Sequence, residues 1–352
     1  MGFFPKERDL TKPPDRIELV VDGSFFREKA SGFQMRLDLF LGAHLTWRSR
    51  TSIQTLVKDG FVHVDAATPD HPEGRGEWSL ERRYGRRLRQ GTRVMVVIPE
   101  DLRLPEFEGG ASSLVILYED EAVVAIDKPA GVAVHPSGRH HSDTLIQRVH
   151  AHFQDQIEER GEAPRLGHRL DRETSGVLLV GKEVASHREL RRQFEAHLVD
   201  KTYLAIVTGD PADEAGSIRM PIGPSTASRI RLKMAIRGDG LEARTDYRVL
   251  ARFGSHALVE CQLFTGRQHQ IRLHLSAAGH PIVGDKLYGP DDELFIRSAE
   301  DRLTPEDLIQ LELPRQALHH HRLAFDTPAG TGRITVESPL AEDLETFLES
   351  LG

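Results

Sequence analysis

Apolar residues recur at helical spacing near the start of the chain. Leu37, Phe40, Leu41 and Leu45 lie three or four residues apart, which predicts a helix that begins near Met35. A second helix is predicted from a capping serine, three apolar residues on one face and a terminal glycine: Ser49, Ile53, Leu56, Val57 and Gly60. Strands are predicted at 17–21, 61–64 and 93–98. Residues 35–98 are therefore expected to form a compact unit of helices and strands.

The rest of the chain is dominated by apolar runs of strand length. Strands are predicted at 114–118, 122–127, 177–180, 203–207, 245–251, 257–264, 322–325 and 333–336. Helices are predicted at 143–153, along Leu190, Phe194 and Leu198, and at 268–278 and 341–351. Strands outnumber helices and do not alternate regularly with them, which favours an α+β fold with a mixed or mainly antiparallel sheet. The acidic stretch 291–312 is expected to be a surface element.

Proline, glycine and serine are frequent between residues 99 and 113, which indicates a linker. The predicted organisation is an N-terminal extension (1–34), a small domain (35–100), a linker (101–113) and a larger domain (114–352). No apolar run approaches the length of a membrane span, and the first residues lack the apolar core of a signal peptide. A monomeric cytoplasmic protein with no membrane association is the expectation.

Composition narrows the possible sites. Cys261 is the only cysteine, which excludes an intramolecular disulfide and a cysteine-based zinc site. His140-His141 and His319-His320-His321 lack metal-ligand spacing, so no metal is expected. The net charge of −8 argues mildly against nucleic-acid binding, but arginines cluster without any acid at Arg82, Arg83, Arg86, Arg87, Arg89 and Arg93. That cluster is typical of a phosphate-contacting face, with a charge-solubilised loop as the alternative.

Asp171 is the most informative single residue. It lies in the polar turn of Gly167–Lys182, directly before an apolar run that predicts a buried strand. A carboxylate held at the edge of a core can act as a nucleophile or as an acid/base. Arg169 and Arg172 are cations beside it and should keep it ionised. The alternative is a salt-bridged structural aspartate.

Two further stretches are candidates for chemistry. Thr265–Leu275 follows a predicted strand and opens a helix, so Arg267, Gln268 and Arg272 near that helix start predict an anion site. Ile271, Leu275 and Ala278 of this helix are expected to pack inward. A solvated basic helix end is the alternative. Lys201-Thr202-Tyr203 begins another predicted strand, and the alternative there is a surface and core pair.

Four motifs in order resemble the RluA-type pseudouridine synthases. The first is Asp127-Lys128-Pro129-Ala130-Gly131 with Val134-His135-Pro136, and the second is His168-Arg169-Leu170-Asp171 with Thr174-Ser175-Gly176. The third is Lys201-x-Tyr203 followed by Ala205 and Gly209. The fourth runs from Thr265-Gly266-Arg267-x-His269-Gln270-Ile271-Arg272 to Gly279-His280-Pro281-Ile282-x-Gly284-Asp285 and Tyr288-Gly289. The resemblance covers about residues 114 to 350.

Residues 35–98 are similar to a small RNA-binding module shared with a protein of the small ribosomal subunit. The matching residues are Arg36-Leu37-Asp38-x-Phe40-Leu41, Ser49-Arg50, Asp59-Gly60-x-Val62 and Gly91-x-Arg93-Val94. Pro69–Tyr84 departs from the short hairpin of that module by an insertion. The RNA-binding residues that this resemblance and the arginine cluster imply are Arg36, Arg48, Arg50, Arg82, Arg83, Arg86 and Arg87.

The family resemblance implies catalytic roles for three residues. Asp171 would be the nucleophile that lets uracil detach from C1′ and reattach through C5, without the sequence deciding between attack on sugar and on base. Arg272 would be its ion-pair partner, and Tyr203 would stack on the target base and assist removal of the C5 proton. Arg169 would fill the place of the flipped uridine, since a stacked base cannot be reached. The other implied substrate-binding residues are His168, Lys201, Arg267, His269 and Gln270.

The resemblance thus implies an isomerase that needs neither a metal nor a redox cofactor and acts on structured RNA. Large-subunit ribosomal RNA is the expected substrate, because the appended module resembles that of the rRNA-directed members. A tRNA substrate is the alternative within the family. A non-catalytic RNA-binding or ribosome assembly protein is the alternative outside it.

Overall fold

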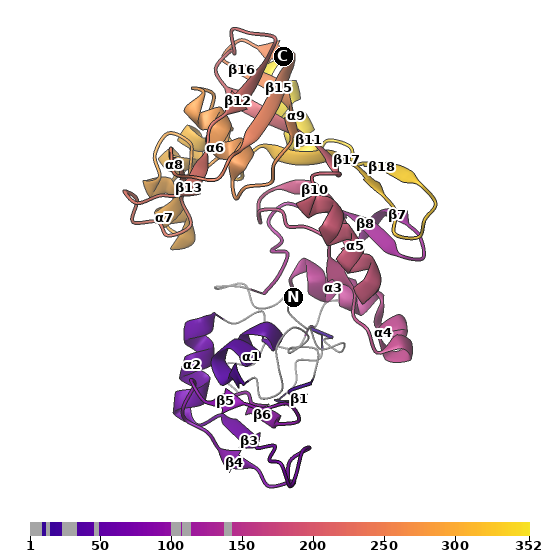
Figure 1. Ribbon diagram of the computed structural model, residues 1–352. Coiled ribbons are helices and arrows are strands. Elements are labelled where there is room, and N and C mark those ends of the chain that lie inside the picture. Colours follow the sequence, from indigo (N-terminus) through magenta and orange to yellow (C-terminus); the bar gives the residue numbers. More distant parts are fainter. Residues whose placement is uncertain are drawn as a thin grey trace. The chain divides into compact units, whose positions relative to one another are not determined.

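The computed structural model describes residues 9–11, 15–22, 34–45, 49–99, 107, 114–136 and 143–352. The chain divides into two compact units, one of residues 1–110 with 135–163 and the other of residues 111–134 with 164–352. Figure 1 labels the helices and strands of both units along the chain. This division assigns 135–163 to the N-terminal unit, whereas the sequence analysis draws one continuous domain over 114–352. Almost all of the predicted linker, and His140-His141, lie outside the described residues.

The first unit contains a four-stranded sheet in the order β1-β6-β3-β4. Its strands and helices are β1 (Arg16–Val20), β2 (Met35–Arg36), α1 (Leu37–His44), α2 (Arg50–Asp59), β3 (Val62–Asp65), β4 (Ser79–Leu80), β5 (Arg87–Leu88) and β6 (Arg93–Val97). The predicted caps of the second helix are confirmed: Ser49 Oγ accepts the N–H of Ser52 at 3.2 Å, and Gly60 ends the helix with φ 91°. The apolar faces predicted for both helices are buried together with β3 and β6.

The first unit also contains α3 (Leu145–His152) and α4 (Gln154–Arg160). A capping box between Thr144 and Gln147 begins α3, as the prediction of a helix over 143–153 requires. The helix α4 was not predicted, because only Ile157 on it is buried and no apolar repeat marks it. The N–H of Leu10 donates to His150 Nδ1 at 2.9 Å, which ties the N-terminal segment to α3.

The second unit is built on a ten-stranded sheet, in the order β12-β15-β16-β11-β17-β10-β8-β7, and in addition β18 pairs with β17 and β9 with β10. Its strands are β7 (Val115–Glu119), β8 (Val123–Lys128), β9 (Arg165–Leu166), β10 (Ser175–Gly181), β11 (Asp200–Thr208), β12 (Ala215–Arg219), β15 (Arg244–Phe253), β16 (His256–Leu263), β17 (Leu318–Asp326) and β18 (Arg333–Glu337). Only β10 and β17 pair in parallel within this sheet. The predicted mainly antiparallel α+β fold is therefore confirmed.

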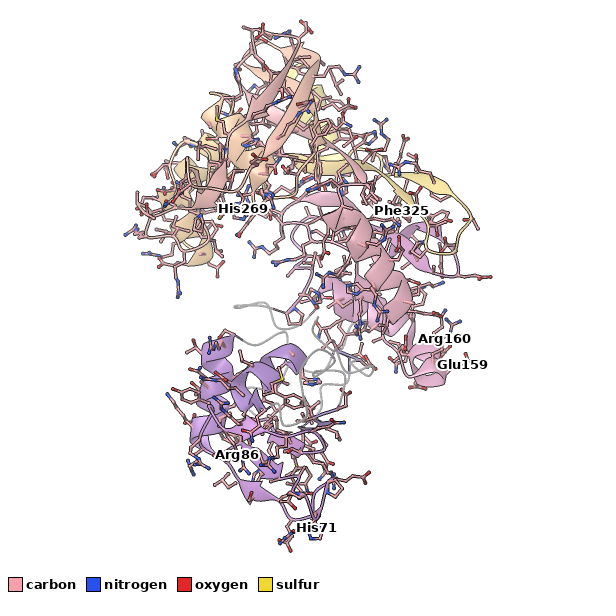
Figure 2. The ribbon with its side chains drawn as sticks, viewed as in Figure 1. His71, Arg86, Glu159, Arg160, His269 and Phe325 are labelled. Atoms are coloured by element: carbon pink, nitrogen blue, oxygen red, sulfur yellow. The ribbon has the colours of Figure 1, made fainter. Side chains whose placement is uncertain are left out.

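The remaining elements of the second unit are α5 (Val184–Glu195), β13 (Ile222–Pro224), β14 (Met234–Ile236), α6 (Gln270–Ala277), α7 (Glu293–Ala299), α8 (Pro305–Leu311) and α9 (Glu342–Leu351). The helix α5 contacts β10, where the core includes Leu190 and Phe325; Figure 2 labels Phe325 on β17. The prediction that Leu198 belongs to this helix is wrong, since the helix ends at Glu195 and Leu198 is 45% exposed.

Two other predictions about packing are corrected. Ala278 does not pack inward, because it is the exposed residue at which α6 ends. The acidic stretch 291–312 is more than a surface element, because it forms α7 and α8 and buries Leu294 completely. Leu311 of α8 is buried as well, and the many charged residues around these two leucines give no clear helical pattern in the sequence.

The three consecutive histidines of β17 bond to neighbouring strands. His319 hydrogen-bonds Ser175 Oγ and the carbonyl of Ser338, and His320 Nδ1 donates to the carbonyl of Val177 at 2.6 Å. His321 Nδ1 donates to the same Ser338 carbonyl at 2.8 Å. Within the described residues, no group of three or more His, Cys, Asp or Glu side chains is arranged to hold a metal ion.

Candidate active site

Asp171 lies in the loop between β9 and β10, and this loop is held on several sides. Lys128 at the end of β8 is fully buried, and its ammonium donates to the carbonyls of Pro129, Val132 and Arg172. A buried ammonium is stable only with its donors satisfied, so Lys128 ties β8 to the loop of Asp171. On the far side of the loop, the side chain of Gln316 donates to Thr174 Oγ1 at 2.6 Å.

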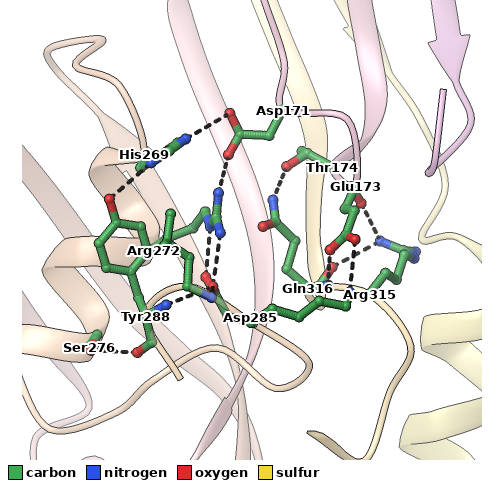
Figure 3. Close-up of polar contacts among 12 residues, drawn as sticks. Asp171, Glu173, Thr174, His269, Arg272, Ser276, Asp285, Tyr288, Arg315 and Gln316 are labelled. Atoms are coloured by element: carbon green, nitrogen blue, oxygen red, sulfur yellow. Dashed lines mark hydrogen bonds and ion pairs between the residues drawn. The ribbon is translucent and has the colours of Figure 1, made fainter. Parts of the chain in front are cut away.

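The side chain of Glu173 extends these attachments. Lys286 donates to it at 2.8 Å, and Arg315 donates to its backbone carbonyl (Figure 3). Asp343 on α9 in turn holds Arg315 through two hydrogen bonds. The loop is thus fixed to the segment directly before β17 and, through Arg315, to α9, which pre-organises Asp171.

Arg272 on α6 bridges two aspartates from distant parts of the sequence. Its Nη1 donates to Asp171 Oδ2 at 2.7 Å, while Nε and Nη2 donate to the two oxygens of Asp285 at 2.7 and 2.9 Å (Figure 3). Asp285 is fully buried and also accepts the backbone N–H groups of Leu287 and Tyr288. The Arg272 guanidinium is 9% exposed, whereas the Asp171 side chain is 32% exposed. Asp171 is therefore the solvent-facing end of a buried charge network.

The network keeps the two carboxylates ionised. Burial by itself raises the pKa of Asp171, but the charge of Arg272 and the hydrogen bond from Arg272 outweigh burial and leave the pKa below its usual range. The pKa of Asp285 is lowered in the same way by Arg272 and by two backbone N–H groups, against its burial. Burial opposes the charge of Arg272, yet both aspartates raise its pKa. All three groups are charged at neutral pH.

His269 precedes α6 and faces the second oxygen of Asp171. Its Nε2 lies 3.9 Å from Asp171 Oδ1, and its Nδ1 is hydrogen-bonded to the hydroxyl of Tyr288 at 2.9 Å (Figure 3). The Tyr288 ring also lies against the Arg272 guanidinium, 5.2 Å from its carbon. Arg272 on α6 and His269 at the start of this helix thereby face the two oxygens of Asp171.

Tyr203 on β11 contributes an aromatic surface next to Asp171. Its ring stacks on His320 with centroids 4.2 Å apart and planes 10° from parallel, and His168 packs edge-on against the same imidazole. Burial, followed by the charge of Asp171, raises the pKa of Tyr203, so the phenol is neutral at neutral pH. Burial and the nearby Lys201 lower the pKa of His168 to about 3, so this imidazole is neutral as well.

The other predicted substrate-binding residues differ in their exposure to solvent and in how far other protein groups already bind their polar atoms. Arg169 is exposed beside Asp171. Lys201 is 6% exposed and lies over the ring of Phe194. Arg267 donates to the carbonyl of Glu242. Gln270 is buried. Its side-chain amide forms hydrogen bonds with Thr265, Arg267, Arg244 and Thr245. These contacts shape the turn that begins α6, and the anion site predicted at this helix start is instead the place where Arg272 binds two carboxylates.

In the first unit, two buried carboxylates hold exposed arginines. Asp38 accepts hydrogen bonds from Arg36, Arg50 and Gln54, and these outweigh burial and lower the pKa of Asp38 to about 2. Its side chain is 0% exposed, while those of Arg36 and Arg50 are 43% and 63% exposed. Each of these two guanidinium groups is thus bound to the buried carboxylate and is still partly exposed to solvent.

Glu81 is the second buried carboxylate, and it binds Arg83 and Arg86. Arg86 is labelled in Figure 2 in the violet part of the chain. The backbone carbonyl of Arg86 accepts the N–H of Leu37, the neighbour of Asp38. The arginines bound to Glu81 therefore lie close to those bound to Asp38. Arg87 is exposed opposite Arg36 in the β2–β5 pairing, and Arg82 donates to the carbonyl of Lys58. Arg48 lies outside the described residues.

Three residues of the site escaped the sequence analysis as functional candidates. Asp285 and Tyr288 lie in the fourth motif, but the neighbouring sequence does not say that they contact Arg272 and His269. His320 appeared within a histidine run, where its stacking on Tyr203 depends on the pairing of β11 with β17. A carboxylate that follows Gly284 in a tight turn was the available signal for Asp285.

Comparison with known proteins decides the family. The profile of the RNA pseudouridylate synthase family matches residues 122–277. The RNA pseudouridine synthase YlyB of Bacillus subtilis is 35% identical over 317 residues, which are 90% of this chain and 94% of that protein. Ribosomal large subunit pseudouridine synthase D of Pseudomonas aeruginosa is 35% identical over 90% of this chain and 92% of its own length. The chain belongs to the RluA-type pseudouridine synthase family.

As a pseudouridine synthase, the protein is an isomerase that converts uridine in RNA to pseudouridine. The structure of human RNA pseudouridylate synthase domain containing 4 is 28% identical with a TM-score of 0.52, and covers 67% of this chain and 92% of that one. The structure of domain containing 1 is 26% identical with a TM-score of 0.51, and covers 69% and 96%. Every helix in the described residues is too short or too polar to span a bilayer.

Proposed function

We propose that this pseudouridine synthase modifies uridines of large-subunit ribosomal RNA and uses Asp171 as its nucleophile. One observation carries the assignment of Asp171. Among the three charged groups of this network, Asp171 alone reaches solvent, while Asp285 and Arg272 are buried. A substrate can therefore meet only the Asp171 end of the network.

The network supplies what the reaction demands. The net change breaks the C1′–N1 bond, forms a C1′–C5 bond and moves one proton from C5 to N1. An ionised carboxylate can stabilise the electron-poor sugar or bind the detached base, and a nucleophile must stay deprotonated to do so. Arg272 keeps Asp171 ionised through its charge, and because it engages Oδ2, it leaves Oδ1 toward the substrate.

Tyr203 is the wall against which the extracted base stacks. A target uridine must leave the RNA stack before its C1′ and C5 can be reached, and an aromatic face stabilises it outside the stack. His320 backs one face of Tyr203. The raised pKa of Tyr203 keeps its hydroxyl protonated at rest, which favours stacking as its main role. Arg169, exposed beside Asp171, takes the place that the uridine vacates.

Two observations support ribosomal RNA as the substrate. Relatives 34–35% identical over 90% of this chain are named ribosomal large subunit pseudouridine synthase D. The first unit presents four arginines held by two buried carboxylates, which fits a phosphate backbone because an anchored guanidinium loses little conformational entropy on binding.

Incubating the purified protein with unmodified large-subunit rRNA and with unmodified tRNA tests the substrate. Carbodiimide mapping of pseudouridine is expected to give stops at discrete positions in the rRNA and none above background in the tRNA. RNA treated with Asp171→Asn protein is the matched control. Stops in tRNA alone would make tRNA the substrate.

The arginine surface of the first unit is tested by salt dependence. Arg50→Gln and Arg83→Gln are each expected to weaken binding to structured RNA and to lower the salt slope by about 1, because each removes one phosphate contact. Arg16→Gln is the control, since Arg16 is 66% exposed in the same unit but pairs with Glu18 on β1 and not with Asp38 or Glu81. Unchanged slopes in the first two variants would remove this surface from the RNA interface.

A further inference from the structure

His269 has a backbone conformation that needs an explanation. It is the N-cap of α6 with φ 55° and ψ 22°. These angles lie in the left-handed region, which residues other than glycine rarely adopt. This conformation directs the imidazole toward Asp171 on one side and Tyr288 on the other (Figure 3). Unfavoured backbone angles of this kind persist where the surrounding structure enforces them, and they are frequent at functional sites.

The hydrogen bonds around Tyr288 decide which nitrogen of His269 carries the proton. The hydroxyl oxygen of Tyr288 accepts the backbone N–H of Met234 at 2.9 Å, and its own proton points to His269 Nδ1 at 2.9 Å. A proton on Nδ1 would deprive the hydroxyl of this acceptor and turn the lone pair of Nε2 toward the Asp171 carboxylate. We therefore assign the neutral tautomer with its proton on Nε2. Burial lowers the pKa of His269 despite the opposing effect of Asp171, which agrees with a neutral ring.

The Nε2–H group is available to a substrate. Its distance of 3.9 Å from Asp171 Oδ1 is too long for a hydrogen bond, and no other acceptor for it lies within the described part of the chain. The imidazole is 10% exposed. The Nε2–H group of His269 lies beside Asp171 Oδ1, the oxygen that Arg272 leaves free. A substrate that reacts with this oxygen must therefore come close to His269.

We propose that His269 is a further catalytic residue, whose Nε2–H donates a hydrogen bond to a carbonyl oxygen of the uracil ring while the ring is detached from C1′. This proposal rests on Asp171 being the nucleophile. When the C1′–N1 bond breaks, its electron pair stays with the uracil, and the negative charge spreads onto the ring oxygens. His269 stabilises that charge and keeps its own proton throughout. A neutral donor suits this position, because a second cation would compete with Arg272 for Asp171 and weaken the nucleophile.

Two amide variants separate this role from a backbone role. The amide nitrogen of glutamine reaches the place of Nε2, whereas that of asparagine reaches only the place of Nδ1. His269→Gln is expected to slow single-turnover pseudouridine formation at saturating enzyme by about threefold to tenfold, and His269→Asn by about 10²–10³-fold, the usual effect of losing one donor to a developing charge. If His269 served only its left-handed backbone, the order would reverse, because asparagine adopts that conformation more readily than glutamine.

A second variant tests the assigned tautomer. Tyr288→Phe keeps the ring beside Arg272 but removes the hydroxyl that fixes His269. It is expected to slow the reaction about tenfold in the wild-type background, in proportion to a lost orienting hydrogen bond, and to have little effect in the His269→Gln background, where no tautomer has to be selected. Melting temperatures of all variants check that they fold.

The outcomes distinguish this proposal from the function on which it rests. Activity retained by Asp171→Asn would overturn the proposed nucleophile. Loss of activity in Asp171→Asn, with His269→Asn as fast as His269→Gln or faster, would overturn the role of His269 alone. Equal rates for the two amide variants, fast or slow, would also overturn it, because a donor at Nε2 would then make no difference.

Discussion

Asp171→Asn protein is expected to form pseudouridine at least about a thousandfold more slowly than wild type, as is usual when a nucleophile is removed. Asparagine matches aspartate in shape and can still accept a hydrogen bond from Arg272, so the loop held by Lys128 and Gln316 should keep its structure. What changes is the negative charge at the solvent-facing end of the network. Single-turnover formation of pseudouridine in RNA, read by carbodiimide mapping, measures the effect.

Asp326→Asn is the matched control for that substitution. Asp326 lies on β17 of the same unit, is 58% exposed and pairs weakly with Arg333 at 3.7 Å. Its replacement should leave the rate within about twofold of the wild-type rate, because exposed ion pairs contribute little to stability. RNA affinity should be unchanged in both variants. Equal pseudouridine yields from wild type and Asp171→Asn would remove Asp171 from the mechanism.

Arg272→Ala is expected to abolish activity and also to destabilise the protein by about 3–5 kcal/mol, the usual cost of leaving a buried charge without its partner. The charge left behind is Asp285, which is fully buried and receives two hydrogen bonds from Arg272. Asp171 loses the partner that holds it ionised and oriented. Chemical denaturation measures the stability, and single-turnover assays at a temperature where the variant is folded measure the rate.

A double variant separates the two effects of Arg272. In Arg272→Met with Asp285→Asn, no charge is left buried, and the amide oxygen of the introduced asparagine can still accept the N–H groups that Asp285 accepts from Leu287 and Tyr288. Much of the lost stability should return, while activity should not. RNA affinity should stay near that of wild type. A large loss of affinity in the double variant would instead make Arg272 a phosphate ligand.

Local pattern determined much of the fold. The apolar spacing around Leu37 and Phe40, the cap at Ser49 and the glycine at position 60 predicted α1 and α2 with their buried faces, because helix periodicity and capping are properties of neighbouring residues. Most strands of the large sheet were located for the same reason. Pattern failed at Leu198, and it missed the helices of 291–312, where only a few apolar residues, among them the buried Leu294 and Leu311, lie between many charged ones.

The sequence by itself also determined the family, because four motifs in the order and spacing of that family do not arise together by chance. Local pattern made Asp171, Tyr203 and Arg272 candidates but left a structural alternative open for each, and the resemblance favoured the catalytic explanation. The tertiary structure decided their chemistry. Asp171 and Arg272 are 101 positions apart, and the fold brings them within 2.7 Å and adds Asp285 behind them. The environment of a charge depends on burial and on partners distant in sequence, and only the packed sheet and helices set these.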